Sequence, residues 1–109
     1  MNQRVEGELN ALPREMQARF ARIFDLIETH GLANVGMPYV RHVQEDIWEI
    51  RASGKDTIGR GLYVTAREKR VVLLRFFVKK TQKTPKKEIQ TAKARARGIE
   101  DAELERREK

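Results

Sequence analysis

Residues 71–78 read VVLLRFFV, a continuous apolar run that only Arg75 interrupts. The run is shorter than most helices, and its β-branched and aromatic residues favour a strand. A strand without polar alternation has both faces buried, as in the interior of a layered fold. We therefore expect residues 71–78 to form the central and most buried strand of a sheet, and the rest of the chain must cover it.

Two helical stretches precede the sheet. Apolar residues recur at helical spacing over residues 4–12, and a longer stripe at intervals of three and four covers residues 14–29. Pro13 suits the first turn of the second helix. Gly31 suits a left-handed cap after its last turn, and Pro38 blocks continuation. The longer helix is expected to cover one face of the sheet.

Two further strands and a final helix complete the order. Residues 47–52 alternate with a period of two, and a second strand over residues 57–66 contains Arg60. Thr84 can cap a last helix that has Pro85 at its first position. The predicted fold class is α+β, with two N-terminal helices packed on a small three- to four-stranded antiparallel sheet, followed by a C-terminal helix. Residues 1–97 form one domain, and residues 98–109 form a charged tail.

The positive charge of the chain is concentrated in one segment. The net charge is +7, but residues 79–97 hold eight Lys and Arg residues against one acid. Residues 1–78 hold twelve against ten, and residues 98–109 hold three against five. Localised charge of this kind is typical of a nucleic-acid-binding surface. The alternative interpretation is a solvated surface helix.

Several kinds of site are not expected. The chain has no cysteine, which excludes disulfides and thiolate metal sites, and its two histidines lack metal-ligand spacing. No Gly-rich phosphate loop is present, so neither a metal nor a cofactor is predicted. No signal peptide and no apolar run of membrane-spanning length are visible, which fits a cytoplasmic location.

A cluster of cations is expected at the strand ends. Arg51 ends one strand, Arg60 lies within the next, and Lys79 and Lys80 follow the third. In an antiparallel meander these side chains can converge on one open face of the sheet, without a carboxylate of their own. Strict alternation places Tyr63 on the opposite face from Arg60. The glycines on both sides of Arg60 allow a bulge that would change this, or the close approach of a backbone or ligand.

Such a cluster suits RNA chemistry. Arginine forks and lysine ammonium groups bind phosphate. Crowded ammonium groups disfavour one another's charged forms, so one lysine can titrate near neutrality and act as a base. Arginine stays protonated and can stabilise a phosphorane, which fits strand scission by the 2′-hydroxyl. The alternative for Arg51 is a surface salt bridge with Glu49 or Glu68.

Three fragments together resemble a known family. They are IWEIR at 47–51, the glycine-rich stretch with Arg60 and Tyr63, and VVLLRFFVKKTQKTPKKEIQTAKAR at 71–95. The pattern is similar to the phage-derived HigB-like toxins of the RelE/ParE superfamily, over about residues 12–97. The lysine-rich block is long and specific, whereas the IWEIR fragment is weak alone.

The resemblance implies a type II toxin that acts as a metal-independent endoribonuclease on mRNA in the ribosome. It implies a helix-turn-helix antitoxin of the HigA type as partner. Arg60 would contact the scissile phosphate, and a lysine or Tyr63 would share proton transfer. By motif position the catalytic residues would be Arg60, Lys79, Lys80 and Tyr63. The remaining RNA-binding residues would be Arg51, Lys83, Lys86, Lys87 and Arg95.

The sequence departs from the family pattern in three places. The family usually begins with a strand before the first helix, whereas here the helical pattern starts almost at Met1. Asp46 stands where the pattern has Gly, and Gly59 and Gly61 stand where relatives carry larger residues. Two other interpretations stay open beside an inactive toxin relative. One is a non-catalytic RNA-binding module like a double-stranded-RNA-binding domain, and the other is a protein whose basic helix only docks an acidic partner.

Overall fold

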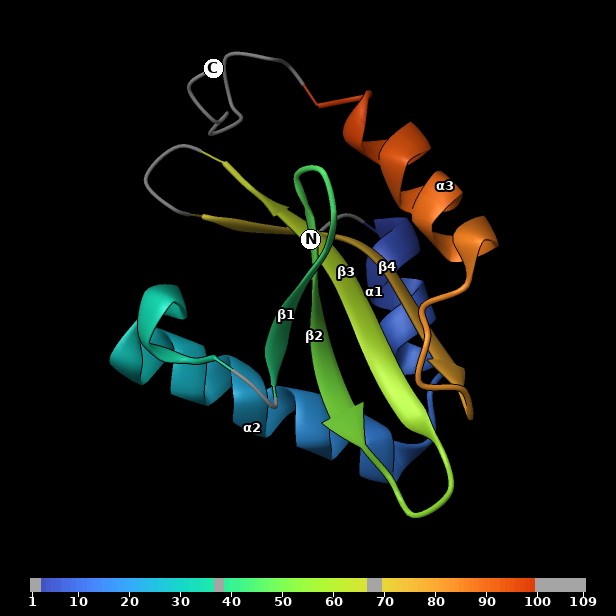
Figure 1. Cartoon of the computed structure of the whole chain (residues 1–109). Helices are drawn as coiled ribbons and strands as arrows, with labels where there is room; N and C mark the ends of the chain where they lie inside the picture. Colours follow the sequence, from blue (N-terminus) through green and yellow to red (C-terminus); the bar gives the residue numbers. More distant parts are fainter. Residues whose placement is uncertain (1–2, 37–38, 67–69, 100–109) are drawn as a thin grey trace.

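The computed structural model describes residues 3–36, 39–66 and 70–99. The helices are α1 (Gln3–Asn10), α2 (Arg14–His30), the short 3₁₀ helix η1 (Leu32–Asn34) and α3 (Lys86–Ala96). The strands are β1 (Val40–Gln44), β2 (Ile47–Ser53), β3 (Ile58–Thr65) and β4 (Val71–Lys79). All four strands pair antiparallel in the order β1-β2-β3-β4 (Figure 1). The predicted α+β class, with helices before and after a small antiparallel sheet, is confirmed.

Strand β1 was not expected as a regular element. It is the exposed edge of the sheet, and mostly polar residues follow Val40. The sequence therefore has no apolar alternation that would indicate a strand here. A two-residue turn joins β1 to β2, and Glu45 within it has a positive φ of 53°. The left-handed residue of this turn is therefore Glu45, and Asp46 does not take the conformation that favours glycine.

The helices divide between the two faces of the sheet. Val5 of α1 and Phe20 of α2 pack with Ile50, Tyr63 and Phe76 in one core cluster. The other face has a smaller cluster, in which Ala92 of α3 lies among strand residues. These strand residues are Ile47, Leu62, Val64, Leu74 and Phe77. The sheet is therefore enclosed by α1 and α2 on one side and by α3 on the other.

The apolar run 71–78 is strand β4, and its predicted central position is wrong. β4 is an edge strand, and β3 lies between it and β2. Both faces of β4 are nevertheless covered, because α1 and α3 both contact it (Figure 1). Burial on both faces explains why β4 lacks polar alternation. Such burial does not require a strand to lie in the centre of the sheet.

Side chains from both neighbouring helices cover the free edge of β4. The Phe76 amide donates a hydrogen bond of 3.2 Å to Glu8 Oε1 of α1, and Arg95 of α3 donates one of 2.8 Å to the Leu74 carbonyl. Backbone groups at a sheet edge otherwise offer a template for another strand. Polar side chains here take the place of a fifth strand.

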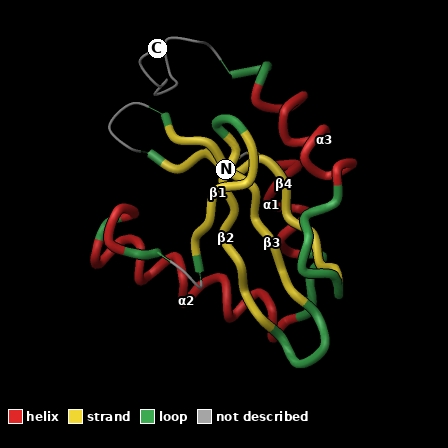
Figure 2. Tube along the Cα trace, viewed as in Figure 1, coloured by secondary structure: helices red, strands yellow, loops and turns green. Residues whose placement is uncertain are grey.

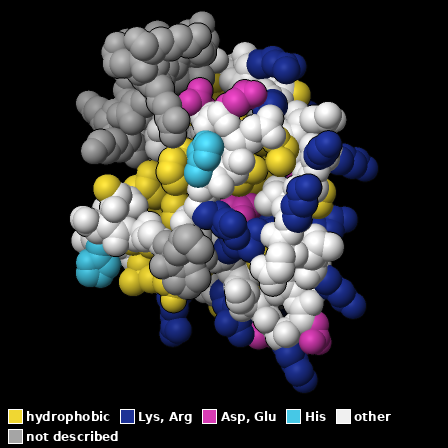
Figure 3. All heavy atoms as spheres, in the orientation of Figure 1, with side chains coloured by type: hydrophobic (Ala, Val, Ile, Leu, Met, Phe, Trp, Pro, Cys, Tyr) yellow, Lys and Arg dark blue, Asp and Glu magenta, His cyan; other side chains and the backbone are white. Residues whose placement is uncertain are grey.

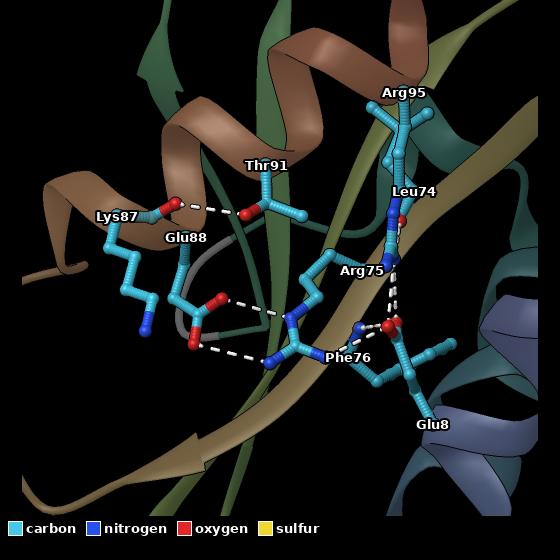
Figure 4. Close-up of polar contacts among 8 residues, drawn as sticks. All are labelled: Glu8, Leu74, Arg75, Phe76, Lys87, Glu88, Thr91 and Arg95. Carbon is cyan, nitrogen blue, oxygen red and sulfur yellow. Dashed lines mark hydrogen bonds and ion pairs between the residues drawn. The ribbon is translucent and has the colours of Figure 1, made fainter.

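The same residues form an ion network across β4 (Figure 4). Arg75 lies between two carboxylates, with Nη1 2.8 Å from Glu8 Oε2 and Nε 2.9 Å from Glu88 Oε1. Arg95 Nη1 lies 2.8 Å from Glu8 Oε2. The hydrogen bond that Arg75 donates to Glu88 raises the pKa of Arg75, with Glu8 adding to this shift and burial opposing it. One guanidinium thus joins α1, β4 and α3.

The glycines beside Arg60 allow α2 to approach the sheet closely. A Cβ added to Gly59 would lie 2.6 Å from Met16 Sδ and 2.9 Å from Phe20 Cε2. A Cβ on Gly61 would lie 2.8 Å from Phe76 Cε1. The bulge expected here lies elsewhere, because the register of β3 and β4 shifts between Leu62 and Tyr63. The glycines therefore serve core packing, and what comes close to them is protein side chain.

Of the helix caps predicted at Gly31 and Thr84, the structure has the first and lacks the second. Gly31 has the expected positive φ of 82°, and its amide bonds to the Ile27 carbonyl. The predicted capping role of Thr84 is wrong, because Pro85 is the residue before α3 and the Thr84 hydroxyl donates to Glu49 Oε2 at 2.7 Å.

Within the described ranges, no helix is long and apolar enough to span a membrane. The predicted tail 98–109 lies outside the described residues from residue 100 onward, as does Glu68.

We expect Gly59→Ala to lower the free energy of unfolding by about 1–3 kcal/mol, because the added methyl overpacks the contact with Met16 and Phe20. Chemical denaturation monitored by circular dichroism would measure the change. The matched control is Gly7→Ala in α1, where nothing lies within 4 Å of the added Cβ. In that variant the free energy of unfolding should rise by about 0.5–1 kcal/mol, because alanine has the higher helix propensity. Equal effects at the two glycines would contradict the packing role of Gly59.

Candidate nucleic-acid interface

A cationic hollow lies at one end of the sheet. The β2–β3 turn and the loop after β4 lie at this same end (Figure 2). They enclose a pocket of about 470 Å³. Its cationic lining residues come from four separate segments and are Arg41, Arg51, Lys55 and Lys80. Asp56 is the acidic residue of the lining. Such a hollow attracts anions, since fields of one sign add up within a concave surface.

Arg51 and Arg60 lie side by side beneath the loop that follows β4. They are directly paired across β2 and β3, so their side chains share the face that α3 covers. Arg60 Nη2 donates to the Thr81 carbonyl, and Arg51 Nη2 donates to the Gln82 carbonyl. Both guanidinium groups therefore hold the loop through its backbone. The predicted convergence of these two arginines on one face agrees with this arrangement.

A buried carboxylate lies within the cluster, and the expectation that none would be near is wrong. Glu49 is 1% exposed and accepts a 2.5 Å hydrogen bond from Arg51 Nε. Arg41 Nε lies 3.9 Å from the same carboxylate oxygen, and the Thr84 hydroxyl bonds to the other oxygen. The salt bridge considered for Arg51 thus exists with Glu49, as a largely buried pair.

Arg60 is fully buried and has spare hydrogen-bonding capacity. Its Nε and Nη1 have no partner among the described residues, while its guanidinium lies 5.8 Å from the centre of the Phe77 ring. Burial lowers the pKa of Arg60, and the charge of Arg51 lowers it further, whereas Glu49 opposes the shift. Unsatisfied buried donors are costly, so these two groups are suited to an anion that enters from the pocket side.

The lysines are distributed along the rim. Lys79 ends β4, and Lys80 and Lys83 are exposed on the following loop. Lys86 and Lys87 are exposed in the first turn of α3. Figure 3 shows Lys and Arg side chains over the middle of this face and along its α3 margin. Of the predicted lysines, Lys80 lines the pocket, whereas Lys79, Lys83, Lys86 and Lys87 are exposed but do not belong to its lining.

Tyr63 does not join this cluster. It is 1% exposed and packs in the core between the sheet and α2, on the opposite face from Arg60. Burial raises the pKa of the Tyr63 phenol to about 12. The alternation along β3 therefore holds at this position, and a side chain on the far face has no path to a phosphate bound by Arg60.

Arg95 also lies away from the pocket. Its guanidinium bonds to Glu8 and to the Leu74 carbonyl at the β4 edge (Figure 4). Both charge and hydrogen bonds of Arg95 are used within the fold. Its predicted role in RNA binding therefore has no support from its position, and its role here is to fix α3.

Sequence reasoning overlooked two residues of the site and considered a third, Glu49, only as a partner of Arg51 in a surface salt bridge. Arg41 was hidden because strand β1 was not expected, and Lys55 lay in a segment treated only as a turn. Glu49 had a usable signal, because residues two apart in a strand share a face and Glu49 precedes Arg51 by two. Pairing of the two could be expected, but the burial of Glu49 under Thr84 depends on the loop.

Neither histidine is among the residues that line the pocket. His42 Nε2 lies 2.6 Å from the Glu45 carbonyl, and the ring packs edge-on against Trp48. Within the described ranges, no three His, Asp or Glu side chains are grouped so that they could hold a metal ion.

Comparison with known proteins places most of the chain in one family. A family model described as "Phage derived protein Gp49-like (DUF891)" matches residues 7–97. The family is toxin-like, of the RelE and HigB type. No curated protein matches the chain.

The pKa of the buried Tyr63 phenol should be higher than the usual value for tyrosine. Because the folded pKa of Tyr63 is raised from 10.0 to about 12, folding stabilises its neutral form. This contribution, about 2–3 kcal/mol by linkage, is fully present below pH 10 and is lost as the pH rises from 10 to 12. Ultraviolet absorbance of tyrosinate in Tyr39→Phe would follow Tyr63 alone. Ionisation near pH 10 with the fold intact would contradict its burial.

The paired arginines should differ in their effect on stability. Arg60→Met removes two unsatisfied buried donors and should raise the free energy of unfolding by roughly 1–3 kcal/mol. Arg51→Met leaves Glu49 buried without its closest partner and should lower it by about 3 kcal/mol. Thermal and urea denaturation would measure both. A loss of stability in Arg60→Met equal to that in Arg51→Met would show that Arg60 has a structural role.

Proposed function

Because this chain belongs to the Gp49-like family of phage-derived proteins, we propose that it is the toxin of a type II toxin–antitoxin system and a metal-independent endoribonuclease. Its substrate is mRNA held in the decoding site of the ribosome. The family match supports the toxin assignment, and the cationic pocket supports a polyanionic substrate.

The single observation that carries the nuclease proposal is the state of Arg60. A buried guanidinium with two unused donors is costly to the fold, and it is paired across the sheet with Arg51, which lines the pocket. A phosphodiester oxygen would supply the missing acceptors with charge-assisted hydrogen bonds. Because Arg60 is enclosed by the loop that carries Thr81 and Gln82, this loop moves aside when RNA binds.

The proposed reaction is an internal transesterification. The substrate 2′-hydroxyl loses its proton to a base and attacks the adjacent phosphorus, while the bond to the 5′-oxygen breaks and that oxygen takes up a proton. The products are a 2′,3′-cyclic phosphate and a free 5′-hydroxyl. Arg60 and Arg51 stabilise the charge that develops on the phosphorane oxygens. Of the lysines in the family pattern, Lys80 lines the pocket, and we assign it the proton transfer.

The proposed partners of the chain are RNA and a protein antitoxin. We propose that exposed lysines at the rim guide the protein to ribosomal and messenger RNA by long-range attraction. The antitoxin is a helix-turn-helix protein of the HigA type, encoded beside this chain. The alternative interpretation, a module like a double-stranded-RNA-binding domain, depended on a predicted order with three strands, whereas the sheet has four.

Primer extension on mRNA in a reconstituted translation system tests the cleavage. Wild-type protein should create new 5′ ends within codons occupying the decoding site, and Arg60→Ala should lower the yield of these ends by about 100-fold or more. Arg22→Ala, which removes one exposed cation from α2, is the matched control and should cleave as the wild type does.

Absence of new ends with the wild-type protein would overturn the nuclease assignment. Equal cleavage by Arg60→Ala would overturn the role of Arg60. Because Arg60→Ala leaves the cations that line the pocket in place, binding of RNA measured in parallel separates lost chemistry from lost affinity.

A further inference from the structure

The buried carboxylate of Glu49 connects three segments that form the site. Arg51 on β2 donates to one of its oxygens at 2.5 Å, and Thr84 at the end of the loop donates to the other at 2.7 Å. Arg41 on β1 approaches within 3.9 Å. Both carboxylate oxygens are thus engaged, and the residue is 1% exposed.

These contacts determine the direction of the Arg51 guanidinium. Glu49 binds its Nε, which leaves Nη1 and Nη2 directed at Gln82 of the loop. The arginine is held at one end by a charge and at the other by neutral acceptors. A phosphate can displace the neutral Gln82 groups, since charge-assisted hydrogen bonds are about twice as strong as neutral ones. The contact to Glu49 would keep the guanidinium in place during this exchange.

Glu49 also offsets repulsion within the cluster. Arg51 and Arg41 both lower the pKa of Arg60, and Glu49 raises it. The carboxylate thus reduces the repulsion that three neighbouring arginines would otherwise exert on one another. Through Thr84, which directly precedes Pro85 and α3, it also anchors the end of the lysine-bearing loop.

We propose that Glu49 is a positioning residue for RNA cleavage, which orients Arg51 and anchors the loop without touching the substrate. The inference rests on the proposed function of the site. A role as proton acceptor does not fit the geometry, because both oxygens already accept hydrogen bonds inside the protein.

The experiment compares Glu49→Gln with the matched control Glu28→Gln, which changes an exposed glutamate in the last half of α2. Each full-length protein is tested for cleavage in the reconstituted translation system and for binding to an RNA with 2′-O-methyl groups, which cannot be cleaved. Glu49→Gln should lower the cleavage rate at saturating protein by about ten- to a hundredfold, since small misplacements of catalytic groups have effects of this size.

RNA affinity should not fall together with the cleavage rate. This difference distinguishes a positioning role of Glu49 from a general loss of the folded site. Loss of a negative charge beside the pocket should leave RNA affinity unchanged or tighten it. Glu28→Gln should match the wild type in both measurements. Unchanged cleavage in Glu49→Gln, or affinity lost in parallel with activity, would overturn the proposal.

A readout without ribosomes keeps the proposal testable if the wild type does not cleave. The Arg51 Nε–H resonance in nitrogen NMR should be shifted and slow to exchange in the wild type, and should lose both properties in Glu49→Gln. Thr84→Val, which removes only the hydroxyl, serves if Glu49→Gln fails to fold, and should speed amide exchange in residues 80–84. An Arg51 signal unaffected by Glu49→Gln, or unchanged loop exchange in Thr84→Val, would overturn the positioning role, whereas absent wild-type cleavage overturns only the nuclease.

Discussion

The ion network around Arg75 is the interaction on which the arrangement of this protein depends. β4 is buried on both faces although it lies at the edge of the sheet, and such an edge needs partners for its backbone groups. Glu8 and Arg95 provide them, while Arg75 and Glu88 join the helices on either side. With α3 fixed in this way, the loop between β4 and α3 has to cross the end of the sheet where Arg51 and Arg60 lie.

The two charged clusters of the molecule differ in balance. Around Arg75, two arginines meet two glutamates, and their hydrogen bonds are satisfied within the fold. Around Arg60, Arg41 and Arg51 share Glu49, and two donors of Arg60 have no partner among the described residues. The first arrangement stabilises the fold, whereas the second leaves positive charge and donors available. A buried cation whose hydrogen-bond donors are not all satisfied indicates a site for an anion.

The local sequence pattern predicted the helices and strands well, but it predicted the contacts between them less well. The long helix and the strands at 47–52, 57–66 and 71–78 could be found because their apolar residues follow clear periods. Strand β1 could not, because an exposed polar edge has no such period. The face occupied by Tyr63 followed from alternation along β3. The loop over Arg60 and the engagement of Arg95 could not be predicted, because both depend on contacts between residues more than twenty positions apart.

The glycines beside Arg60 link the core of the protein mechanically to its site. Met16 and Phe20 of α2 come so close to Gly59 that no side chain fits between them. Arg60, the next residue, projects from the other side of the same strand. Only the backbone of β3 therefore lies between α2 and the side chain of Arg60. A larger side chain at Met16 or Phe20 would press on this backbone, so selection on the hydrophobic interior of the protein also acts on the position of Arg60.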